Sequence, residues 1–263
     1  IRRQRQMCIR DRAPTRHGRR SCPKPIKNLP FSGRFFIAFN VAYDILLPGR
    51  KSMPVIKYCI WDVGNVIYNY TLEPVHDWCE RRTADRETFL RHKGKFSYND
   101  YMKGLVPYAE LCRQLCDFYA IPYHKDYAIE LNRAFHAGIK DYFPQTRQTQ
   151  EELQQRGIAN CILSNALPVL AGDNKAADII PQERQFCSFD LGLLKPDPEI
   201  YRRVREKLGC RFEELIFVDD KPKNTKAAAE LGIHAVTFNP QTIIGDIRKI
   251  ISPQKMPHQT KSR

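Results

Sequence analysis

Short apolar runs that alternate with amphipathic helical stretches constrain the fold of this chain more than any other feature. Four runs have the length and composition of buried strands, at 55–61, 158–163, 215–218 and 234–238. The stretches between them have helical periodicity, at 146–157, 198–209 and 224–232. Apolar strands separated by such helices form parallel sheets that are covered on both faces. The sequence therefore predicts an α/β fold with a doubly wound, Rossmann-like parallel sheet.

One long stretch interrupts this alternation. Residues 71–143, here called the helical insert, contain four short amphipathic patterns and no clear strand; in one of them Leu111, Leu115 and Phe118 form an apolar face. An insert that follows the first strand can cover the carboxyl edge of the sheet and exclude water. We therefore predict a core domain, 53–70 and 144–251, with a small all-helical cap domain, 71–143. A helical extension that only packs on the sheet is the alternative.

The positive charge of the chain is concentrated near its start. Of 43 Lys and Arg and 29 acidic residues, 13 and two fall in residues 1–52, which leaves 30 basic and 27 acidic residues in 53–263. The body is thus almost neutral, and the formal charge of +14 is no sign of nucleic-acid binding. We expect neither a nucleic acid nor a membrane as partner.

The leader 1–52 begins with a dozen residues that have neither helical nor strand periodicity. Met7–Asp11 can be encoded by a sequence that resembles an adapter used in sequencing libraries, so we expect a non-native or disordered basic leader and a natural start at Met53. A targeting segment is the alternative, although its apolar run, Phe35–Leu47, is too short to span a membrane. The polar tail 252–263 is expected to be disordered.

The cysteines indicate a reducing compartment. Two of the nine lie in the leader, and the seven in the body are scattered, several of them inside strand-like runs. An odd, dispersed set predicts buried thiols and no disulfide framework, and hence a cytoplasmic protein. Cys112 and Cys116 can share a helix face, but no further ligands complete a zinc set.

Polar side chains follow three of the predicted strands and one further turn. They are Asp62, Ser164 with Asn165, Lys195, and Asp219 with Asp220. Residues at the carboxyl ends of parallel strands meet at the edge where α/β proteins bind ligands. As a set, a carboxylate nucleophile, a hydroxyl, a cation and a carboxylate pair suit magnesium-assisted phosphoryl transfer.

Each of these residues also has a structural interpretation. Asp62 and Gly64 suit an ordinary turn after a strand, and Ser164 and Asn165 suit the cap of a helix that begins near Ala166. Most lysines are solvated surface charges, although the prolines beside Lys195 can aim it at a dianion. Adjacent aspartates are favourable at a helix N-terminus as well as on magnesium.

In combination the four segments resemble the motifs of the haloacid dehalogenase (HAD) superfamily. They are WDVGNVIYNY from Trp61, ILSN to Asn165, DLGLLKPDPEIY to Tyr201, and VDDKPKNTKAAAELGI from Val218. The resemblance is to the branch with a helical cap after the first strand, and within it to bacterial sugar phosphatases of the α-glucose-1-phosphatase type. It covers roughly residues 55–240.

The resemblance implies a role for each site residue. Asp62 is the nucleophile and, with the Gly64 carbonyl, Asp219 and Asp220, a ligand of Mg²⁺. Ser164, Asn165 and Lys195 hold the phosphoryl oxygens, and Asn224 supports the loop of the acid pair. It implies a magnesium-dependent hydrolase that acts on a small phosphorylated metabolite, with a sugar phosphate as one possibility, through a phosphoaspartyl intermediate.

One position departs from the family pattern. Most HAD phosphatases have a second aspartate two residues after the nucleophile as general acid and base, whereas this chain has Gly64. Such help contributes roughly 10²- to 10⁴-fold to the rate. Gly64 favours one alternative, a non-catalytic protein that binds a phosphorylated ligand or partner. A metal-independent dehalogenase is a further, separate alternative. The acid pair opposes the latter, because it would repel a haloacid without a cation.

The helical insert is expected to set substrate specificity. Its polar candidates for contacts in the cleft are Tyr98, Asn99, Tyr101, Lys103 and His124. Short helical patterns do not reveal which of these side chains face the cleft, so the substrate and the oligomeric state are not predicted.

Overall fold

The computed structural model describes residues 55–171 and 180–252 of the 263-residue chain. The chain divides into two compact units, 1–52 and 53–263, and every described residue belongs to the second. The predictions made for the leader 1–52, and for the tail beyond Ser252, therefore lie outside the described residues.

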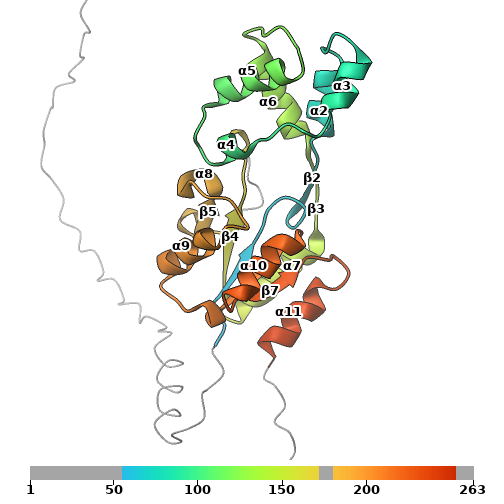
Figure 1. Ribbon diagram of the computed structural model, residues 1–263. Helices are drawn as coiled ribbons and strands as arrows, with labels where there is room; N and C mark the ends of the chain where they lie inside the picture. Colours follow the sequence, from blue (N-terminus) through green and yellow to red (C-terminus); the bar gives the residue numbers. More distant parts are fainter. Residues whose placement is uncertain (1–54, 172–179, 253–263) are drawn as a thin grey trace, which may run out of the picture. The chain divides into compact units, whose positions relative to one another are not determined.

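A parallel sheet of five strands forms the centre of the described unit, in the order β5-β4-β1-β6-β7 (Figure 1). All four strand pairs are parallel, and β1 lies between β4 and β6. The strands are β1 (Tyr58–Trp61), β4 (Ala159–Ser164), β5 (Gln185–Cys187), β6 (Leu215–Asp219) and β7 (His234–Thr237). The predicted α/β class and its doubly wound parallel sheet are confirmed. β5 was not predicted, because three residues carry too little periodicity to mark a strand.

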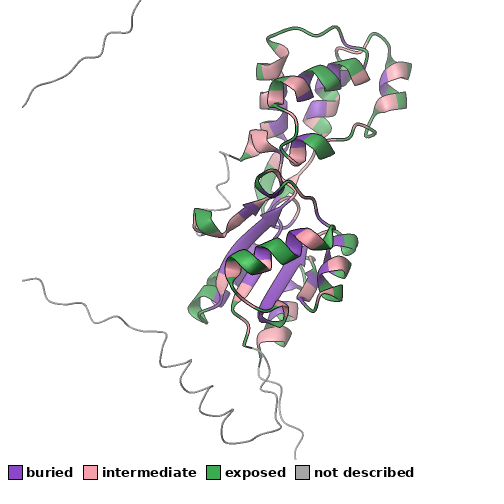
Figure 2. Ribbon diagram, turned by 60° about the vertical axis from the view of Figure 1, so that its left-hand side comes forward, coloured by how far each residue is buried: buried purple, intermediate pink, exposed green. Residues whose placement is uncertain are grey.

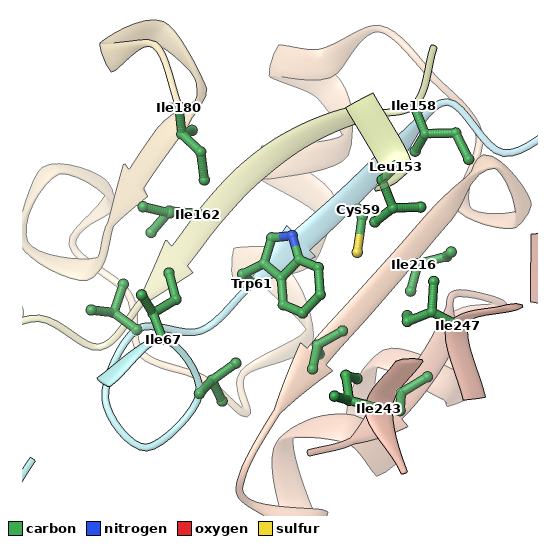
Figure 3. Close-up of a cluster of buried hydrophobic side chains, with 14 of the residues drawn as sticks. Cys59, Trp61, Ile67, Leu153, Ile158, Ile162, Ile180, Ile216, Ile243 and Ile247 are labelled. Carbon is green, nitrogen blue, oxygen red and sulfur yellow. The ribbon is translucent and has the colours of Figure 1, made fainter. Parts of the chain in front are cut away.

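Helices cover both faces of the sheet, since successive side chains of a strand point to opposite sides. Cys59 and Trp61 of β1 pack into one apolar cluster with Leu153, Ile243 and other residues (Figure 3). The intervening Ile60 packs into the cluster on the other face. The helices of the first face are α7 (Pro144–Gln155) and α11 (Ile243–Ile251), and those of the second are α8 (Ser188–Leu191), α9 (Pro198–Leu208) and α10 (Pro222–Glu230).

The strands of the sheet are largely buried (Figure 2), so their backbone groups depend on the sheet for hydrogen bonds. In the part of the core that the structure describes, the connections contain three short 3₁₀ turns: η1 (Pro168–Leu170), η3 (Gln182–Arg184) and η4 (Phe212–Glu214).

The helical insert has an apolar cluster of its own. Leu111, Leu115 and Phe135 are buried there, together with Trp78 and Tyr119, apart from the two clusters on the sheet. Its helices are α2 (Glu73–Glu80), α3 (Arg86–His92), α4 (Asn99–Met102), α5 (Tyr108–Phe118) and α6 (Tyr127–Ala137). Four of them correspond to the predicted patterns, whereas α4 is a single short turn that periodicity does not reveal.

Two antiparallel strands connect the helical insert to the core. β2 (Tyr68–Tyr70) pairs with β3 (Ile139–Tyr142), and the expectation that 71–143 holds no strand was wrong for β3. Three of the four β3 residues are exposed, so the segment lacks the apolar run by which the other strands were predicted. The chain passes closely at this point: a Cβ on Gly138 would collide with the Thr71 carbonyl oxygen, which explains the glycine.

Candidate active site

Asp62 lies directly after β1, at the carboxyl edge of the sheet between the two neighbouring strands. Its backbone N–H donates to the Val218 carbonyl at 2.8 Å and so continues the ladder to β6. The residue is only 6% exposed, and Oδ1 accepts from the Val63 N–H at 2.7 Å and from Lys195 Nζ at 2.9 Å. Burial of an unpaired carboxylate is energetically costly, and these two donors offset that cost.

Lys195 is a buried cation with three oxygen partners. Nζ lies 2.9 Å from Asp62 Oδ1, 2.6 Å from Asp219 Oδ2 and 2.8 Å from the Leu163 carbonyl oxygen. These acceptors come from β1, β6 and β4, so the ammonium group joins the ends of three adjacent strands. Lys195, which precedes the two prolines, is therefore a buried group and not a solvated surface charge.

Asn165 fixes the backbone of Lys195. Its Nδ2 donates to the Lys195 carbonyl and its Oδ1 accepts from the Lys195 N–H, both at 2.9 Å. The amide group of Asn165 is thereby used on both sides to position Lys195. Ser164 ends β4 nearby, and its side chain lines the same cavity as Asp62.

The helix that the sequence predicts near Ala166 does not begin there. Leu167 is extended, as a residue before proline commonly is, and Pro168–Leu170 forms only a 3₁₀ turn. The Ala166 N–H instead donates to Ser188 Oγ at 3.1 Å. Ser164 and Asn165 therefore do not serve as the helix cap that was their structural interpretation.

The two adjacent aspartates have different surroundings. Asp219 is fully buried, and its carboxylate accepts from Lys195 Nζ, from Asn224 Nδ2 at 2.9 and 3.0 Å, and from the Lys221 N–H at 2.9 Å. Asp220 keeps a buried Oδ1 that has no hydrogen-bond partner within 55–171 and 180–252. The Tyr201 hydroxyl donates to the Asn224 carbonyl at 3.0 Å, and it thereby helps to position the residue that binds the Asp219 carboxylate.

This cluster has more negative than positive charge. Ligand oxygens of Asp62, Asp219 and Asp220 lie within 4.8 Å of one another, with Lys195 as the cation in contact with two of them. Burial raises the pKa of Asp62, an effect that Lys195 opposes, and burial likewise raises the pKa of Asp220. Hard oxygen ligands and one orphaned buried carboxylate oxygen fit a magnesium ion, which takes such ligands and keeps several waters.

A cavity of about 480 Å³ opens above this cluster. Residues of the core and of the helical insert line it, among them Asp62, Gly64, Ser164, Asn165 and Lys195 from the predicted set. Tyr68 and Tyr70 of β2 also line it, and sequence reasoning missed both. The two tyrosines are two positions apart, and residues at this spacing in a strand lie on the same face. This spacing is the sequence signal that could have indicated them.

The specificity candidates of the helical insert separate into two groups. Tyr98 lines the cavity above Asp62, and Asn99 and Lys103 line a neighbouring cavity of about 440 Å³. Tyr101 is buried in the core of the insert, and His124 is exposed beside Asp126, so neither of these two candidates lines the two cavities. Tyr101 packs with the apolar side chains of the insert. The residue type alone does not show whether a tyrosine packs in a core or faces a cavity.

The seven cysteines of the described part are free thiols, five of them buried and two partly buried, as the sequence predicted. Cys112 and Cys116 belong to the apolar cluster of the insert. Across 55–171 and 180–252, no helix has the length and apolar character needed to cross a membrane.

Comparison with known proteins identifies the family. The model of the haloacid dehalogenase-like hydrolases matches residues 56–232. The fold is shared with a HAD family enzyme from Bacteroides thetaiotaomicron, with a TM-score of 0.60 and 22% identity over 71% of this chain and 95% of that one. Another structure of that enzyme is a complex with magnesium and inorganic phosphate. The chain belongs to the haloacid dehalogenase-like hydrolase family, and the predicted enzyme class, a HAD-like hydrolase, is confirmed.

Curated relatives match over shorter segments. A flavin mononucleotide hydrolase from Arabidopsis thaliana is 45% identical over 53 residues, 20% of this chain and 22% of that protein. A phosphoserine phosphatase from Thermus thermophilus is 27% identical over 139 residues, 47% of this chain and 56% of that protein. The chain thus spans at most about half the length of these two relatives. The finer resemblance to α-glucose-1-phosphatases stays a prediction.

Proposed function

We propose that the protein is a magnesium-dependent phosphomonoester hydrolase that acts on a small phosphorylated metabolite. One observation carries the proposal: a buried lysine holds Asp62 at the floor of a cavity, beside an acid pair of which one member is fully paired and the other is not. The named phosphatase and nucleotide hydrolase among the relatives are consistent with this reaction.

Asp62 is proposed as the nucleophile. The two donors described above contact Oδ1, so we assign the attack to Oδ2. Oδ2 forms a bond to phosphorus while the bond from phosphorus to the ester oxygen breaks, and the alcohol leaves with a proton from solvent. Water then attacks phosphorus, which releases inorganic phosphate and restores the Asp62 carboxylate.

Lys195 keeps its position through both steps, because its backbone is held by Asn165 and its ammonium group by three oxygens. A preorganised cation at the reacting group stabilises charge on the transferring oxygens without reorganisation. Ser164, at the end of β4, is proposed to donate to a phosphoryl oxygen.

Mg²⁺ is proposed to bind to Asp62, the Gly64 carbonyl and Asp220, with Asp219 and Asn224 holding the loop of the acid pair. When bound, the ion supplies positive charge that offsets the phosphoryl oxygens and the clustered carboxylates. Asp220 suits the role of a direct ligand, since its Oδ1 has no other partner among the described residues. Asp219 suits a supporting role, since four contacts already occupy its oxygens.

A non-catalytic binding protein is the second candidate, because Gly64 leaves no side chain to protonate the leaving group. The test is phosphate release from a panel of phosphorylated metabolites with Mg²⁺ and with a chelator. We expect metal-dependent release that Asp62→Asn abolishes and that Asp77→Asn, at an exposed position of α2, leaves unchanged. Metal-dependent binding of phosphate esters without release would favour the second candidate, and release by Asp62→Asn at the wild-type rate would exclude the covalent route.

A further inference from the structure

Three lysines with no ion pair in the described part of the chain converge on the second cavity, the one of about 440 Å³. Lys103 directly follows α4 in the helical insert, Lys221 follows the acid pair, and Lys223 lies in the first turn of α10. They come from three segments that are distant in the sequence. Lys57, Lys93 and Lys249, elsewhere on the surface, each lie within 3.0 Å of a carboxylate oxygen.

The wall of this cavity does not neutralise the three lysines. Lys195 also lines it, but its charge is already matched by Asp62 and Asp219. Asp197 is the one acidic side chain among the described residues that line it, and its Oδ1 accepts from the Glu199 N–H at 2.9 Å as the cap of α9. Lys221 also interacts electrostatically with the adjacent Asp220, whereas Lys103 and Lys223 face Asp197 alone. The remaining excess of positive charge in a concave site attracts anions.

The second cavity adjoins the one above Asp62. Five residues line both: Met102, Asn165, Lys195, Lys221 and Asn224. A ligand whose phosphoryl group lies at Asp62 can thus extend past Lys195 into the second cavity. A hydrogen bond connects the insert with the core beside these cavities, because Ser188 Oγ donates to the Met102 carbonyl at 2.6 Å.

We propose that this second cavity binds a further anionic group of the substrate, so that the substrate class is a phosphomonoester that also carries a carboxylate or a second phosphate. The inference rests on the proposed function and adds the chemistry of the leaving group. A site with unpaired charged groups discriminates against an analogue that lacks the matching group, because its cations then stay without a partner. Lys103 and Lys223 are the specificity-determining residues, and Lys221 lies too close to the acid pair to be tested separately.

The test uses matched substrates on the full chain with Mg²⁺. Each set has one chain length, from three to six carbons, and holds an alkyl phosphate, the phosphooxyalkanoate and the alkanediol bisphosphate. We expect kcat/KM for the member with the additional anion to exceed that of the alkyl phosphate by about 5- to 10-fold at one or two lengths, the size that partly exposed ion pairs allow. The carboxylate and bisphosphate arms show which anion the cavity prefers.

Lys103→Gln and Lys223→Gln should each reduce this preference toward one while kcat/KM for the alkyl phosphate stays within about twofold. Lys226→Gln is the control, because it removes the same charge from the exposed side of the same helix and lines neither cavity. The proposal is overturned if no chain length shows a preference, or if Lys226→Gln lowers the preference as much as Lys223→Gln.

Failure of the proposed function gives a different result. If no ester is hydrolysed, calorimetry on the wild-type chain with Mg²⁺ measures the affinity for the same sets. Tighter binding of the members with a second anion, lost in the Lys103→Gln and Lys223→Gln backgrounds, supports the subsite even then. Equal affinities across every set overturn it.

Discussion

Lys195 at the edge of the sheet and Lys103 in the helical insert carry the same charge beside the same second cavity, in opposite surroundings. The Lys195 side chain is 1% exposed and contacts three oxygens, whereas Lys103 is half-buried and has no ion pair among the described residues. A cation held by several strands can act on a group that every substrate shares. A cation without a partner remains available for the part of the ligand that varies.

Replacement of Lys195 should have the largest effect. Lys195→Met keeps the length of the side chain but leaves two carboxylates buried against each other, so we expect activity to fall at least about 10³-fold. Breaking a buried pair in this way costs about 3–5 kcal/mol, and the free energy of unfolding should decrease by that order. Denaturant unfolding and phosphate release measure both effects.

Lys103→Met is the matched change in the insert. It removes a cation that has no ion pair, so the free energy of unfolding should stay within about 0.5 kcal/mol of the wild type. A comparable loss of stability in both variants would show that the two regions do not differ in the way described.

Loss of the Asn224 side chain should have the next largest effect. Asn224→Ala removes both contacts from Nδ2 to the Asp219 carboxylate, which then holds Lys195 less firmly. Residues that position ligating groups typically contribute 10- to 100-fold, so we expect a decrease of about that size in kcat/KM and in the affinity for Mg²⁺. Titration of activity with Mg²⁺ separates the two. An unchanged affinity for the metal would place Asn224 outside the support of the acid pair.

Gly64 stands where most HAD phosphatases have a general acid, so the next prediction concerns the leaving group. With no acid there, kcat/KM should depend strongly on leaving-group pKa, and glycosyl 1-phosphates and aryl phosphates should be preferred to alkyl phosphates. A Cβ at Gly64 would lie 3.7 Å from Tyr70 Cβ, an ordinary contact, so the first side-chain atom of Gly64→Asp causes no clash. That variant should flatten the dependence. A flat series for the wild type would mean that another group supplies the proton.

The smallest effect is expected at the start of α3, inside the insert. Asp85 accepts from the Thr88 N–H at 2.8 Å and from Thr88 Oγ1 at 2.9 Å, and these hydrogen bonds lower its pKa. A lowered pKa means that the cap stabilises the fold above the ordinary value of 3.8 and that this contribution is lost as the pH falls through the lowered pKa. Asp85→Ala should therefore lower Tm slightly at pH 7, keep kcat unchanged, and make no difference at strongly acidic pH. A loss of kcat would contradict the separation between insert stability and catalysis.

The two regions also differ in how far their sequence predicts them. Asp62, Lys195 and Asp219 follow a strand or a turn whose apolar pattern and order along the chain are both readable, so their meeting at one edge was predictable. Their hydrogen bonds were not, because the use of Asn165 as a holder of Lys195 depends on contacts between residues 30 positions apart. Periodicity does not carry such contacts.

In the insert, the sequence predicted where most helices lie but not which way their polar side chains point. The apolar face of α5 gave its position. In contrast, Tyr98 and Lys103 flank the four-residue helix α4, which contains Tyr101 and is too short to show a periodic apolar face. Tyr101 enters the core of the insert while Tyr98 and Lys103 line different cavities. β3 was missed for a related reason, since its exposed polar residues gain their strand conformation from pairing with β2.

The central claim is that Asp62 forms a covalent bond to the phosphoryl group. The most direct measurement is the mass of the proteolytic peptide that contains Asp62, from enzyme quenched in acid during turnover of a phosphate ester with Mg²⁺. The account predicts an increase by one phosphoryl group on that peptide, which is lost in mild alkali and absent in Asp62→Asn. Rapid turnover with an unmodified peptide at every quench time, combined with phosphate release by Asp62→Asn, would contradict it.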